Sequence, residues 1–391
     1  MQTFYRDSWV EVRLDAIEYN INQLKQHIGK DKKIYAVVKA DAYGHGDTQV
    51  AKAALDAGAA ALAVSLLDEA IRLRECGFTC PILVMGWVRP QDASIAAEMD
   101  ISLTFFQEDW IKEVKNLDLA NPLKLHMKWD TGMGRLGIRS VEEMQVLLKE
   151  VQEDERLILE GIFTHFATAD DSDAAYYQEQ QKRLGEMLTE FKALWQDQVN
   201  VHTSNSAASL RYPGNEEDFV RFGISMYGLY PSPVVKGERQ IELQPAFSLH
   251  SRIVHVKKLK EGECVSYGAT YCATEDTWIA TVPLGYADGW IRRLQGIDVL
   301  VDGKRRPIVG RICMDQFMIE LDKEYDVGEQ VTLIGRQGDE EITADEVAAY
   351  LDTINYEIPC MISERVPRVY KSNQHIVDIE NSLSTNSRKM M

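Results

Sequence analysis

The sequence predicts an α/β fold in which an N-terminal (β/α)8 barrel of the TIM type is followed by a mainly β C-terminal domain. Up to about residue 240, short apolar runs alternate with amphipathic stretches of helical period, which is typical of parallel βα units. Beyond Pro245, the helical stretches give way to short β-rich segments separated by turns. The 391 residues are ample for two such domains, which we place at residues 1–242 and 243–391.

The predicted barrel rests on a series of compact apolar runs that read as strands. They lie at residues 34–38, 61–64, 81–85, 101–104, 123–128, 159–164, 199–203 and 224–229. Helical patterns fill the intervals, for example at residues 50–55, 68–75, 140–152 and 176–195. About eight such βα units close into a barrel of the usual size.

The C-terminal half contains short strand candidates divided by turn signals such as Asp302-Gly303. The strand candidates are residues 247–259, 277–283, 298–301, 307–312, 316–321 and 330–334. One helix, at residues 343–351, interrupts the series, and residues 382–391 read as a frayed tail. We therefore predict a second domain that is mainly β.

The acidic balance of the chain limits its partners. The formal net charge is −18, and such a field repels phosphate backbones and anionic lipid surfaces. We therefore expect no binding to nucleic acid or membranes. No apolar run approaches the roughly 20 residues that span a bilayer, and the N-terminus lacks a basic segment followed by an apolar core. We expect a cytoplasmic protein.

The six cysteines are scattered along the chain, at Cys76, Cys80, Cys264, Cys272, Cys313 and Cys360. Cys76 and Cys80 come closest to the spacing of metal ligands, but no second Cys or His pair supports them. We therefore predict buried, reduced thiols and no metal site.

Lys39 stands at the carboxyl end of the first strand candidate, ahead of a Gly-containing loop. Barrel enzymes keep their active sites at this end of the strands. Partial desolvation there lowers the pKa of an amine and favours Schiff-base chemistry. On position alone, a lysine whose amine snorkels out to solvent is the commoner case.

Residues 37–46 (VVKADAYGHG) resemble the cofactor-lysine signature of the alanine racemase family. Further motifs of that family follow in order at residues 128–137, 164–167, 205–207, 220–224, 265–268, 285–289, 311–316, 355–357 and 365–368. Any one of them is weak, but their joint occurrence across both domains is specific. The resemblance implies a pyridoxal-phosphate-dependent enzyme that interconverts L- and D-alanine and supplies D-alanine for peptidoglycan. It also implies a homodimer with shared active sites.

The resemblance implies that Lys39 holds pyridoxal 5'-phosphate as an internal aldimine. The phosphate would rest on hydroxyls and backbone amides contributed by Tyr43, Ser206, Tyr356, Gly223 and Ile224. Asn205 opens the same Ser-rich junction, where free N–H groups at a helix start favour a phosphate. An ordinary helix N-cap is the alternative interpretation of this junction.

Racemisation needs a base on each face of the aldimine between substrate and cofactor. The resemblance places the free amine of Lys39 on one face and Tyr267 of the partner subunit on the other. We assign the α-proton of D-alanine to Lys39 and that of L-alanine to Tyr267. An unperturbed tyrosine titrates near pKa 10, and the resemblance suggests that a chain through His165 to Arg221 assists it. A satisfied core histidine is the alternative interpretation of His165.

Arg221 is implied to lie against the pyridine nitrogen of the cofactor. An always-charged guanidinium disfavours protonation of that nitrogen. Less charge would then delocalise into the ring, which limits side reactions such as transamination. A structural salt bridge is the alternative interpretation of Arg221.

The remaining predicted site residues surround the substrate. Arg135 is implied to contact the cofactor phenolate oxygen and to help orient the substrate. Lys128 matches a lysine that is carbamylated in many relatives, with an unmodified lysine as the alternative. Met314 and Asp315 correspond to partner-subunit residues near the substrate carboxylate. Tyr286 matches a tyrosine that narrows the access channel, which suits alanine better than a bulky amino acid.

Three other functions share parts of this pattern. A racemase acting on serine or on several amino acids is the nearest, but its broad-specificity relatives are expected to be exported and this chain shows no export signal. A pyridoxal-dependent decarboxylase of the same architecture needs a pocket for a long cationic side chain, and no signature of one is visible. A non-catalytic cofactor carrier lacks the second domain, whereas Tyr267 and Met314 are both present here.

Overall fold

The computed structural model describes residues 4–215 and 217–383. The chain separates into two compact units, one of residues 16–42 and 47–244 and the other of residues up to Asp15, Tyr43–Gly46 and the chain from Pro245 onward. The second unit thus takes an N-terminal stretch that the predicted limits of 1–242 and 243–391 assign to the barrel. Most of the predicted tail, residues 384–391, lies outside the described residues.

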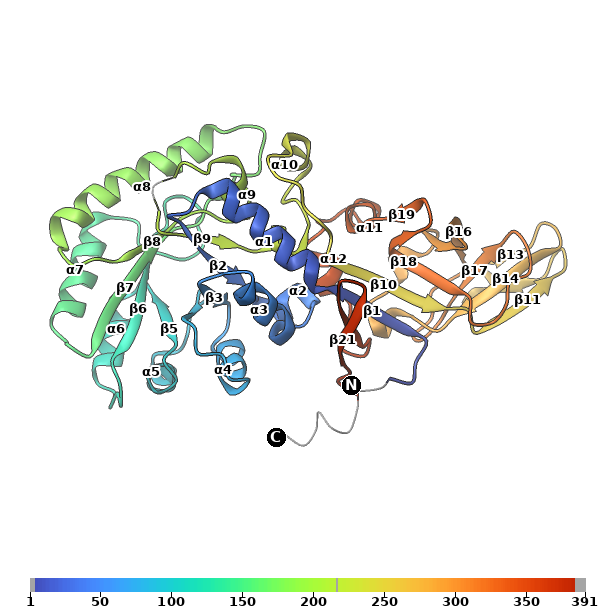
Figure 1. Cartoon of the computed structure of the whole chain (residues 1–391), viewed down its shortest axis with the longest axis horizontal. Coiled ribbons are helices and arrows are strands. Elements are labelled where there is room, and N and C mark those ends of the chain that lie inside the picture. Colours follow the sequence, from blue (N-terminus) through green and yellow to red (C-terminus); the bar gives the residue numbers. More distant parts are fainter. Residues whose placement is uncertain (1–3, 216, 384–391) are drawn as a thin grey trace. The chain divides into compact units, whose positions relative to one another are not determined.

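The first unit is built on a closed barrel of eight parallel strands, which confirms the predicted fold (Figure 1). The strands follow one another around the barrel in chain order: β2 (Lys33–Val37), β3 (Ala61–Val64), β4 (Ile82–Val84), β5 (Ser102–Phe105), β6 (Leu123–Lys128), β7 (Leu157–Phe163), β8 (Asn200–His202) and β9 (Phe219–Phe222). β9 returns to pair with β2 in parallel register. Strands covered on both faces read as continuous apolar runs, and all four residues of β3 are buried.

The eighth barrel strand lies earlier than predicted. We expected it at residues 224–229, but this segment begins with a 3-10 turn, η2 (Ile224–Tyr227), which ends at Gly228 with a φ of 84°. The barrel is closed instead by β9, whose four residues are all buried. The charged Arg221 interrupts the apolar run of β9, and this concealed the strand in the sequence.

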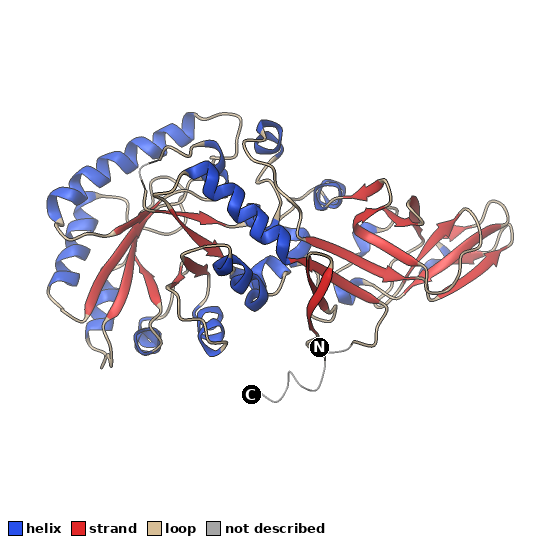
Figure 2. Ribbon diagram, viewed as in Figure 1, coloured by secondary structure: helices blue, strands red, loops and turns tan. Residues whose placement is uncertain are grey.

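Helices alternate with the barrel strands and lie outside them (Figure 2). They are α1 (Leu14–Ile28), α2 (Lys39–Gly44), α3 (Asp47–Asp56), α4 (Leu67–Glu75), α5 (Ala93–Glu98), α6 (Glu108–Lys115), α7 (Val141–Gln152), α8 (Ala175–Leu194), α9 (Ser206–Arg211) and α10 (Pro233–Glu238), with the 3-10 turn η1 (Pro90–Asp92). Side-chain caps start several of them, as at α7, where Ser140 Oγ accepts from the Glu143 amide at 3.2 Å. Within the described residues, no helix has the length and apolar content to cross a membrane.

The second unit is mainly β, as predicted. Its large sheet runs in the order β11 (His255–Leu259), β14 (Thr277–Val282), β17 (Phe317–Leu321), β16 (Lys304–Val309), β15 (Asp298–Val301), β18 (Gln330–Gln337), β10 (Phe247–Arg252), β1 (Ser8–Arg13), β20 (Arg368–Ser372) and β21 (His375–Glu380), with β19 (Glu340–Ile342) beside β18. The helices α11 (Ala344–Leu351) and α12 (Glu357–Cys360) and the turns η4 (Tyr286–Asp288) and η5 (Arg292–Leu294) also belong to this part.

The N-terminal strand β1 was not among the predicted strands. Its side chains alternate between buried and half-buried, the period-2 pattern of a strand with one face in a core. It pairs antiparallel with β10 and parallel with β20, so it lies between two strands from the far end of the chain.

The expectation of six buried, reduced cysteines is wrong. Cys264 and Cys272 are disulfide-bonded, because they face each other across a two-stranded sheet, β12 (Cys264–Val265) and β13 (Tyr271–Cys272), that the sequence did not reveal. The other four form no disulfide and none is fully buried: Cys76 and Cys360 are exposed, and Cys80 and Cys313 are half-buried.

The segment that follows β2 is a left-handed helical turn. Within α2, residues 40–43 have φ angles between 51° and 54°, and Gly44 follows at 81°. Each residue with a side chain loses roughly 1–2 kcal/mol in this conformation, so surrounding contacts must hold it. Only glycine fits at position 44, because a Cβ there would overlap the backbone carbonyl of Pro359.

Two hydrogen bonds hold the outer side of this turn. The Ala40 amide donates to Glu69 Oε1 at 2.6 Å, and Asp41 Oδ1 accepts from the Asp47 amide at 3.0 Å. Aspartate and asparagine are the non-glycine residues that tolerate a left-handed backbone best. The aspartate at position 41 therefore suits its conformation.

We expect Ala40→Gly to raise the free energy of unfolding by about 0.5–1 kcal/mol, because glycine adopts a positive φ without strain. Ala349 offers a matched control, since it is also exposed but lies in the right-handed helix α11. There the same substitution should lower stability by about 1 kcal/mol. Denaturant midpoints measure both, and an equal loss in the two variants would contradict the left-handed turn.

Candidate active site

The barrel brings most of the predicted cofactor residues to the carboxyl ends of its strands. Lys39 follows β2, Lys128 ends β6 with Arg135 in the loop beyond it, His165 follows β7, Asn205 and Ser206 follow β8, and Arg221, Gly223 and Ile224 lie in or directly after β9. These ends meet at one rim of a parallel barrel. Residues that are far apart in the sequence thus share one mouth.

Arg221 is the buried cation of this mouth, with 3% of its surface exposed. Its Nη1 donates to the carbonyl oxygen of His202 at 2.6 Å and to His202 Nδ1 at 3.0 Å. Its Nη2 donates to the carbonyls of Thr164 (2.7 Å) and Thr203 (3.0 Å) and to His165 Nδ1 (3.3 Å). These partners are carbonyls and imidazoles, unlike those of an ordinary structural salt bridge.

Burial lowers the pKa of Arg221 to about 10, against the opposing effects of Glu217 and Tyr35. The guanidinium therefore keeps its charge at neutral pH. A charge that is desolvated but hydrogen-bonded through both Nη atoms is held in a fixed position.

A chain of hydrogen bonds runs from Arg221 through two further imidazoles. His202 Nε2 lies 2.9 Å from His126 Nδ1, and His126 Nε2 lies 3.0 Å from Glu160 Oε2. Because a guanidinium can only donate, Nδ1 of His202 and Nδ1 of His165 must both be acceptors. Each of these rings then carries its proton on Nε2, so Arg221 sets the tautomer on both sides.

Both imidazoles next to Arg221 are held neutral. Burial, followed by the charge of Arg221, brings the pKa of His165 well below its usual range, and burial also lowers that of His202. A neutral His165 with its proton on Nε2 is a hydrogen-bond donor at the barrel mouth. This differs from a core histidine satisfied on both nitrogens, because no partner is found for Nε2 among the described residues.

Four cations gather at the mouth of this strongly acidic protein: Lys39, Lys128, Arg135 and Arg221 all repel a proton on His165. The pKa of Lys128 is shifted as well. Burial, followed by the charges of Arg135 and Arg221, lowers its pKa to about 8, and Asp130 opposes this. Such a concentration of positive charge fits a phosphate-bearing ligand.

The junction after β8 supplies a hydroxyl and backbone amides. Ser206 Oγ accepts from the amides of Gly223 at 3.0 Å and Ser225 at 3.5 Å. Asn205 is the N-cap of α9 and accepts from the Ala208 amide at 3.0 Å, as the N-cap interpretation requires. The hydroxyl of Ser225 is buried and has no hydrogen-bond partner among the described residues, so polar capacity remains beside Gly223 and Ile224. The donor set of the mouth, with its lysine amine, therefore fits pyridoxal phosphate.

The two predicted phosphate tyrosines both belong to the mainly β unit. The ring centroids of Tyr43 and Tyr356 are 6.4 Å apart. Burial, followed by the neighbouring Tyr356 and Cys360, raises the pKa of Tyr43. The phenol of Tyr43 therefore stays protonated and able to donate to an anion.

The predicted partner-facing residues are on the surface of the mainly β unit. Tyr267 begins the turn η3 (Tyr267–Ala269) with 71% of its surface exposed, and Met314 is 53% exposed. Tyr286 and Asp315 are also exposed.

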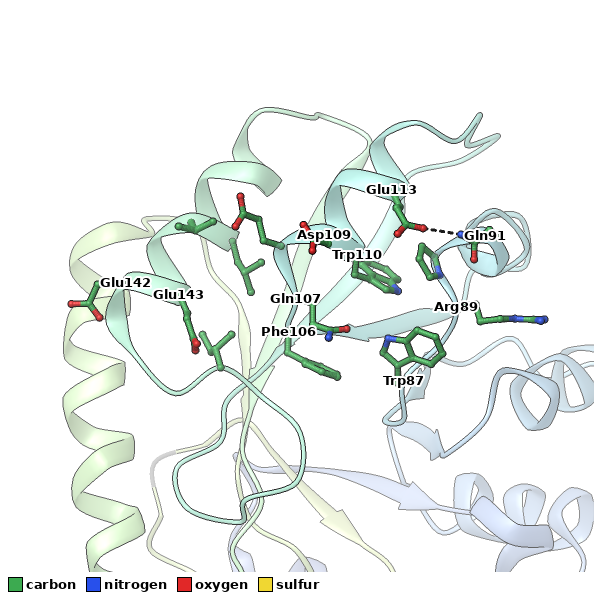
Figure 3. Close-up of a pocket in the computed structure, with 15 residues that line it drawn as sticks. Trp87, Arg89, Gln91, Phe106, Gln107, Asp109, Trp110, Glu113, Glu142 and Glu143 are labelled. Carbon is green, nitrogen blue, oxygen red and sulfur yellow. Dashed lines mark hydrogen bonds between the residues drawn. The ribbon is translucent and has the colours of Figure 1, made fainter.

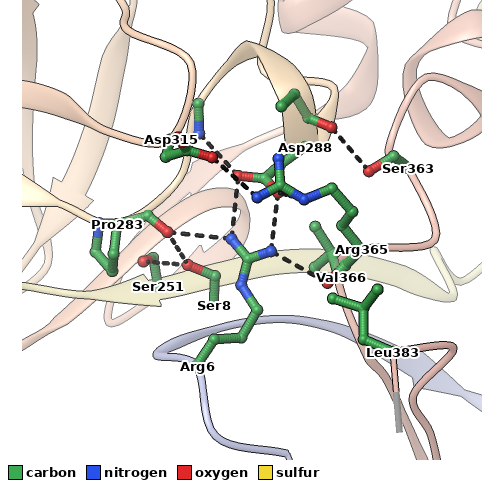
Figure 4. A network of polar contacts seen from close by, with 12 residues as sticks. Arg6, Ser8, Ser251, Pro283, Asp288, Asp315, Ser363, Arg365, Val366 and Leu383 are labelled. Carbon is green, nitrogen blue, oxygen red and sulfur yellow. Dashed lines mark hydrogen bonds and ion pairs between the residues drawn. The ribbon is translucent and has the colours of Figure 1, made fainter.

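A buried carboxylate supports two of these surface loops (Figure 4). Asp288 is fully buried and accepts from both Nη atoms of Arg6, at 2.8 and 3.0 Å, and from the Gly285 amide at 3.0 Å. Arg365 lies 3.6 Å from Asp288 and donates to Asp315 at 2.9 Å. Asp288 thus links the loop of Tyr286 to the loop of Asp315.

A separate pocket of about 850 Å³ lies in the barrel unit, away from the predicted residues (Figure 3). Its aromatic wall includes Trp87 and Trp110. Its carboxylates are Glu108, Asp109, Glu113, Glu142 and Glu143, against the single cation Arg89. An acidic lining of this kind repels phosphate, so the pocket is not the cofactor site.

The sequence analysis missed His202, His126 and Glu160, which continue the chain from Arg221. His202 was part of a strand candidate and His126 part of another, where a histidine reads as an ordinary buried residue. The signal would have been two imidazoles on β6 and β8, the strands on either side of β7, but that requires the barrel register, which the sequence does not show.

Two family models match the chain. The N-terminal domain of alanine racemase matches residues 12–231, and the C-terminal domain of alanine racemase matches residues 246–370. The matches cover both structural units.

Individual relatives agree with the family models over nearly the whole chain. An alanine racemase of Anoxybacillus flavithermus is 53% identical over 98% of this chain and 99% of its own, and one of Geobacillus stearothermophilus is 53% identical over 98% of each. A crystal structure of alanine racemase from Bacillus anthracis with bound L-Ala-P superposes with a TM-score of 0.95 at 51% identity, covering 98% of this chain and 99% of the other.

We expect Asp288→Ala to lower the free energy of unfolding by about 2–3 kcal/mol, because it leaves the Arg6 guanidinium without its buried carboxylate partner. The loss is not larger because the side chain of Arg6 is partly exposed to water. Asp315→Ala is the matched control, because its carboxylate also pairs with Arg365 but is 59% exposed. Its loss should stay below about 1 kcal/mol. Denaturant midpoints of the two variants decide, and equal losses would mean that Asp288 supports nothing beyond its ion pair.

Proposed function

The chain belongs to the alanine racemase family, and we propose that it interconverts L- and D-alanine by a two-base mechanism. The family is pyridoxal-phosphate-dependent, and the full-length relatives are named alanine racemases. The observation that carries the proposal is the cluster of Lys39, Lys128, Arg135 and Arg221 at the barrel mouth of an acidic protein.

In this proposal, Lys39 Nζ would hold the cofactor covalently. The phosphate group would be held by Ser206, the amides of Gly223 and Ile224, and the phenols of Tyr43 and Tyr356, with Asn205 ordering the junction. When bound, pyridoxal phosphate supplies an electron sink that makes the α-proton of an attached amino acid acidic. The residues of the chain then decide which proton moves and from which face.

The two bases are Lys39 and Tyr267 of the partner subunit. The amine of Lys39, once free, takes or returns the α-proton on the D-alanine face. The phenol oxygen of Tyr267 takes or returns it on the L-alanine face. Inversion of the α-carbon without reorientation of the substrate requires a base on each of its two faces.

His165 prepares Tyr267 for this task. Because Arg221 occupies Nδ1 of His165, the imidazole offers its Nε2 proton as a donor. A hydrogen bond to a phenolate favours the ionised form and lowers the pKa of a tyrosine. The buried charge of Arg221 acts in the same direction through the ring.

Arg221 and Arg135 set the electrostatics around the cofactor. A guanidinium that stays charged cannot accept a proton, and it disfavours protonation of any basic nitrogen placed against it. This restricts the spread of negative charge away from the α-carbon, and so favours return of the proton over transamination. Arg135, exposed in the chain, would contact the cofactor phenolate oxygen and the substrate.

Lys128 is proposed to carry a carbamate. A carbamate forms when a neutral amine attacks carbon dioxide and loses a proton, and the pKa of about 8 makes the neutral amine of Lys128 accessible. The resulting anion would pair with Arg135 and hold it in place. It would also offset part of the repulsion among the cations of the mouth.

The complete enzyme would be a homodimer. Tyr267, Met314 and Asp315 would reach the partner's barrel mouth, and Tyr286 would narrow its access channel to the size of alanine. A two-fold axis would repeat this contact and give two equivalent sites. The proposed role is the cytoplasmic supply of D-alanine for peptidoglycan.

The test of the reaction is an absorbance spectrum followed by a racemisation assay on the same sample. We expect a band near roughly 420 nm and conversion of L-alanine to D-alanine, both lost in Lys39→Ala. A band without alanine racemisation would leave the cofactor assignment and move the substrate to serine or to a decarboxylase reaction, which assays with those substrates would identify.

The shared site is tested by a mixed dimer of Lys39→Ala and Tyr267→Phe chains, co-expressed with two different tags and purified through both. One of its two sites then has both bases and the other has neither. We expect each single variant to lose about 10²–10⁴-fold in kcat, and the mixed dimer to recover about half of the wild-type rate. A mixed dimer as inactive as its parents would place both bases on one chain.

The carbamate is tested by 13C NMR after equilibration with labelled bicarbonate. We expect a carbamate signal that disappears in Lys128→Ala. Because the amine becomes protonated as the pH falls through about 8, the signal should decrease from pH 8.5 to pH 6.5 at a constant dissolved concentration of carbon dioxide. Lys304, an exposed lysine of the mainly β unit, gives the matched control Lys304→Ala, which should keep the signal.

A further inference from the structure

A disulfide closes the loop that carries Tyr267. Cys264 and Cys272 are eight residues apart in the sequence and are direct cross-strand partners on β12 and β13, with their Cα atoms 4.0 Å apart. Tyr267 lies between them in the turn η3. The disulfide thus joins the two ends of the loop that carries Tyr267.

Little else holds the tip of this loop. The β12–β13 ladder has two residue pairs and forms a sheet of its own, and a ribbon this short is marginal in water. Residues 267–270 are all exposed. The tip therefore depends on how firmly its two arms are joined.

The backbone of the tip is also in a costly conformation. Ser266 and Ala269 have φ angles of 71° and 46°, and Gly268 has 75°. A serine or alanine is disfavoured in the left-handed region, so the turn persists only where its surroundings impose it.

The non-covalent contacts hold the residues on either side of the tip, which is formed by residues 267–270. Ser266 Oγ donates to the Arg311 carbonyl at 2.7 Å and accepts from the Arg311 amide at 2.9 Å, and the Tyr271 hydroxyl donates to Glu320 at 2.8 Å. Val265 and Ala273 pack into a small apolar cluster. Loss of the disulfide would therefore loosen the tip while the arms stay attached.

We propose that Cys264 and Cys272 are positioning residues for Tyr267, and that their disulfide keeps its phenol oxygen in the place where it exchanges a proton with the substrate. This rests on the proposed role of Tyr267 as the base on the L-alanine face. Reduction leaves the fold and the Lys39 face intact, and slows proton transfer on the Tyr267 face.

The redox step balances as thiol–disulfide exchange. A dithiol reductant transfers two electrons and two protons: the Sγ–Sγ bond breaks, two thiols form, and the reductant closes its own disulfide. A low-molecular-weight disulfide such as oxidised glutathione reverses it and leaves as two thiols. Both cysteines are exposed in the chain, which gives such reagents access.

The test follows the α-proton of D-alanine in D2O with oxidised and reduced enzyme. After Lys39 removes the proton, deuterium returns either on the same face, giving labelled D-alanine, or through Tyr267, giving L-alanine. We expect reduction to raise the ratio of exchange to inversion about 3- to 10-fold, with a similar fall in kcat and less than a twofold change in KM. Mass spectrometry of the peptide containing residues 264–272 assigns the redox state, and amide hydrogen exchange of the tip should become faster.

Matched variants separate the causes. Cys264→Ser/Cys272→Ser should behave as the reduced enzyme and should not respond to reductant, which excludes an effect of the reagent on the cofactor. Cys76→Ser, which removes an exposed thiol directly after α4, should respond as the wild type does. Exchange and inversion that fall together, an unchanged ratio, or a peptide that stays reduced in oxidised glutathione would each overturn the proposal. An unchanged ratio in Tyr267→Phe would instead refute the proposed function of Tyr267.

Discussion

The buried guanidinium of Arg221 is the interaction on which the barrel mouth depends. It is almost completely buried, and it is held there by three carbonyls and two imidazoles from residues at or just beyond the carboxyl ends of β7 and β8. A charge desolvated to this extent is tolerable only with all these partners in place. The same contacts orient His165 and His202 and fix their tautomers. Burial lowers the pKa of Lys128, and the charges of Arg135 and Arg221 add to this effect. Arg221 thus fixes the positions of the hydrogen-bonding groups around it.

The position of this cluster follows from the barrel itself. Parallel strands bring their carboxyl ends to one rim, so Lys39, Lys128, His165 and Ser206 meet although more than a hundred residues separate the first from the last. The total charge of the chain opposes an anionic ligand, yet the mouth is positive because the local cations outweigh distant carboxylates that salt screens. Local arrangement decides binding here, and net charge decides only which large partners are repelled.

Much of the barrel was predictable because strands such as β3 and β4 are buried throughout and read as unbroken apolar runs. β9 escaped because Arg221, its functional residue, breaks that pattern. β12 and β13 are too short to show any period, so the pairing of Cys264 with Cys272 was invisible. The site residues were found through family motifs, whereas the contact of His202 with His126 required the barrel register, since these residues lie on β8 and β6, on either side of β7. The left-handed turn after Lys39 likewise gives no periodic signal, because glycine marks only its end.

The arrangement of β1 has a consequence for biosynthesis. This strand is among the first parts of the chain to leave the ribosome, but its neighbours are β10 and β20, and Val10 pairs with Arg368. The barrel segments and β10 are made long before β20, so the edge of β1 that pairs with β20 must wait with its backbone N–H and C=O groups unpaired. Unpaired strands of this kind are open to wrong partners. The pairing of β1 with β20 therefore comes late in assembly, and until then the open edge of β1 is a place where misassembly competes with folding.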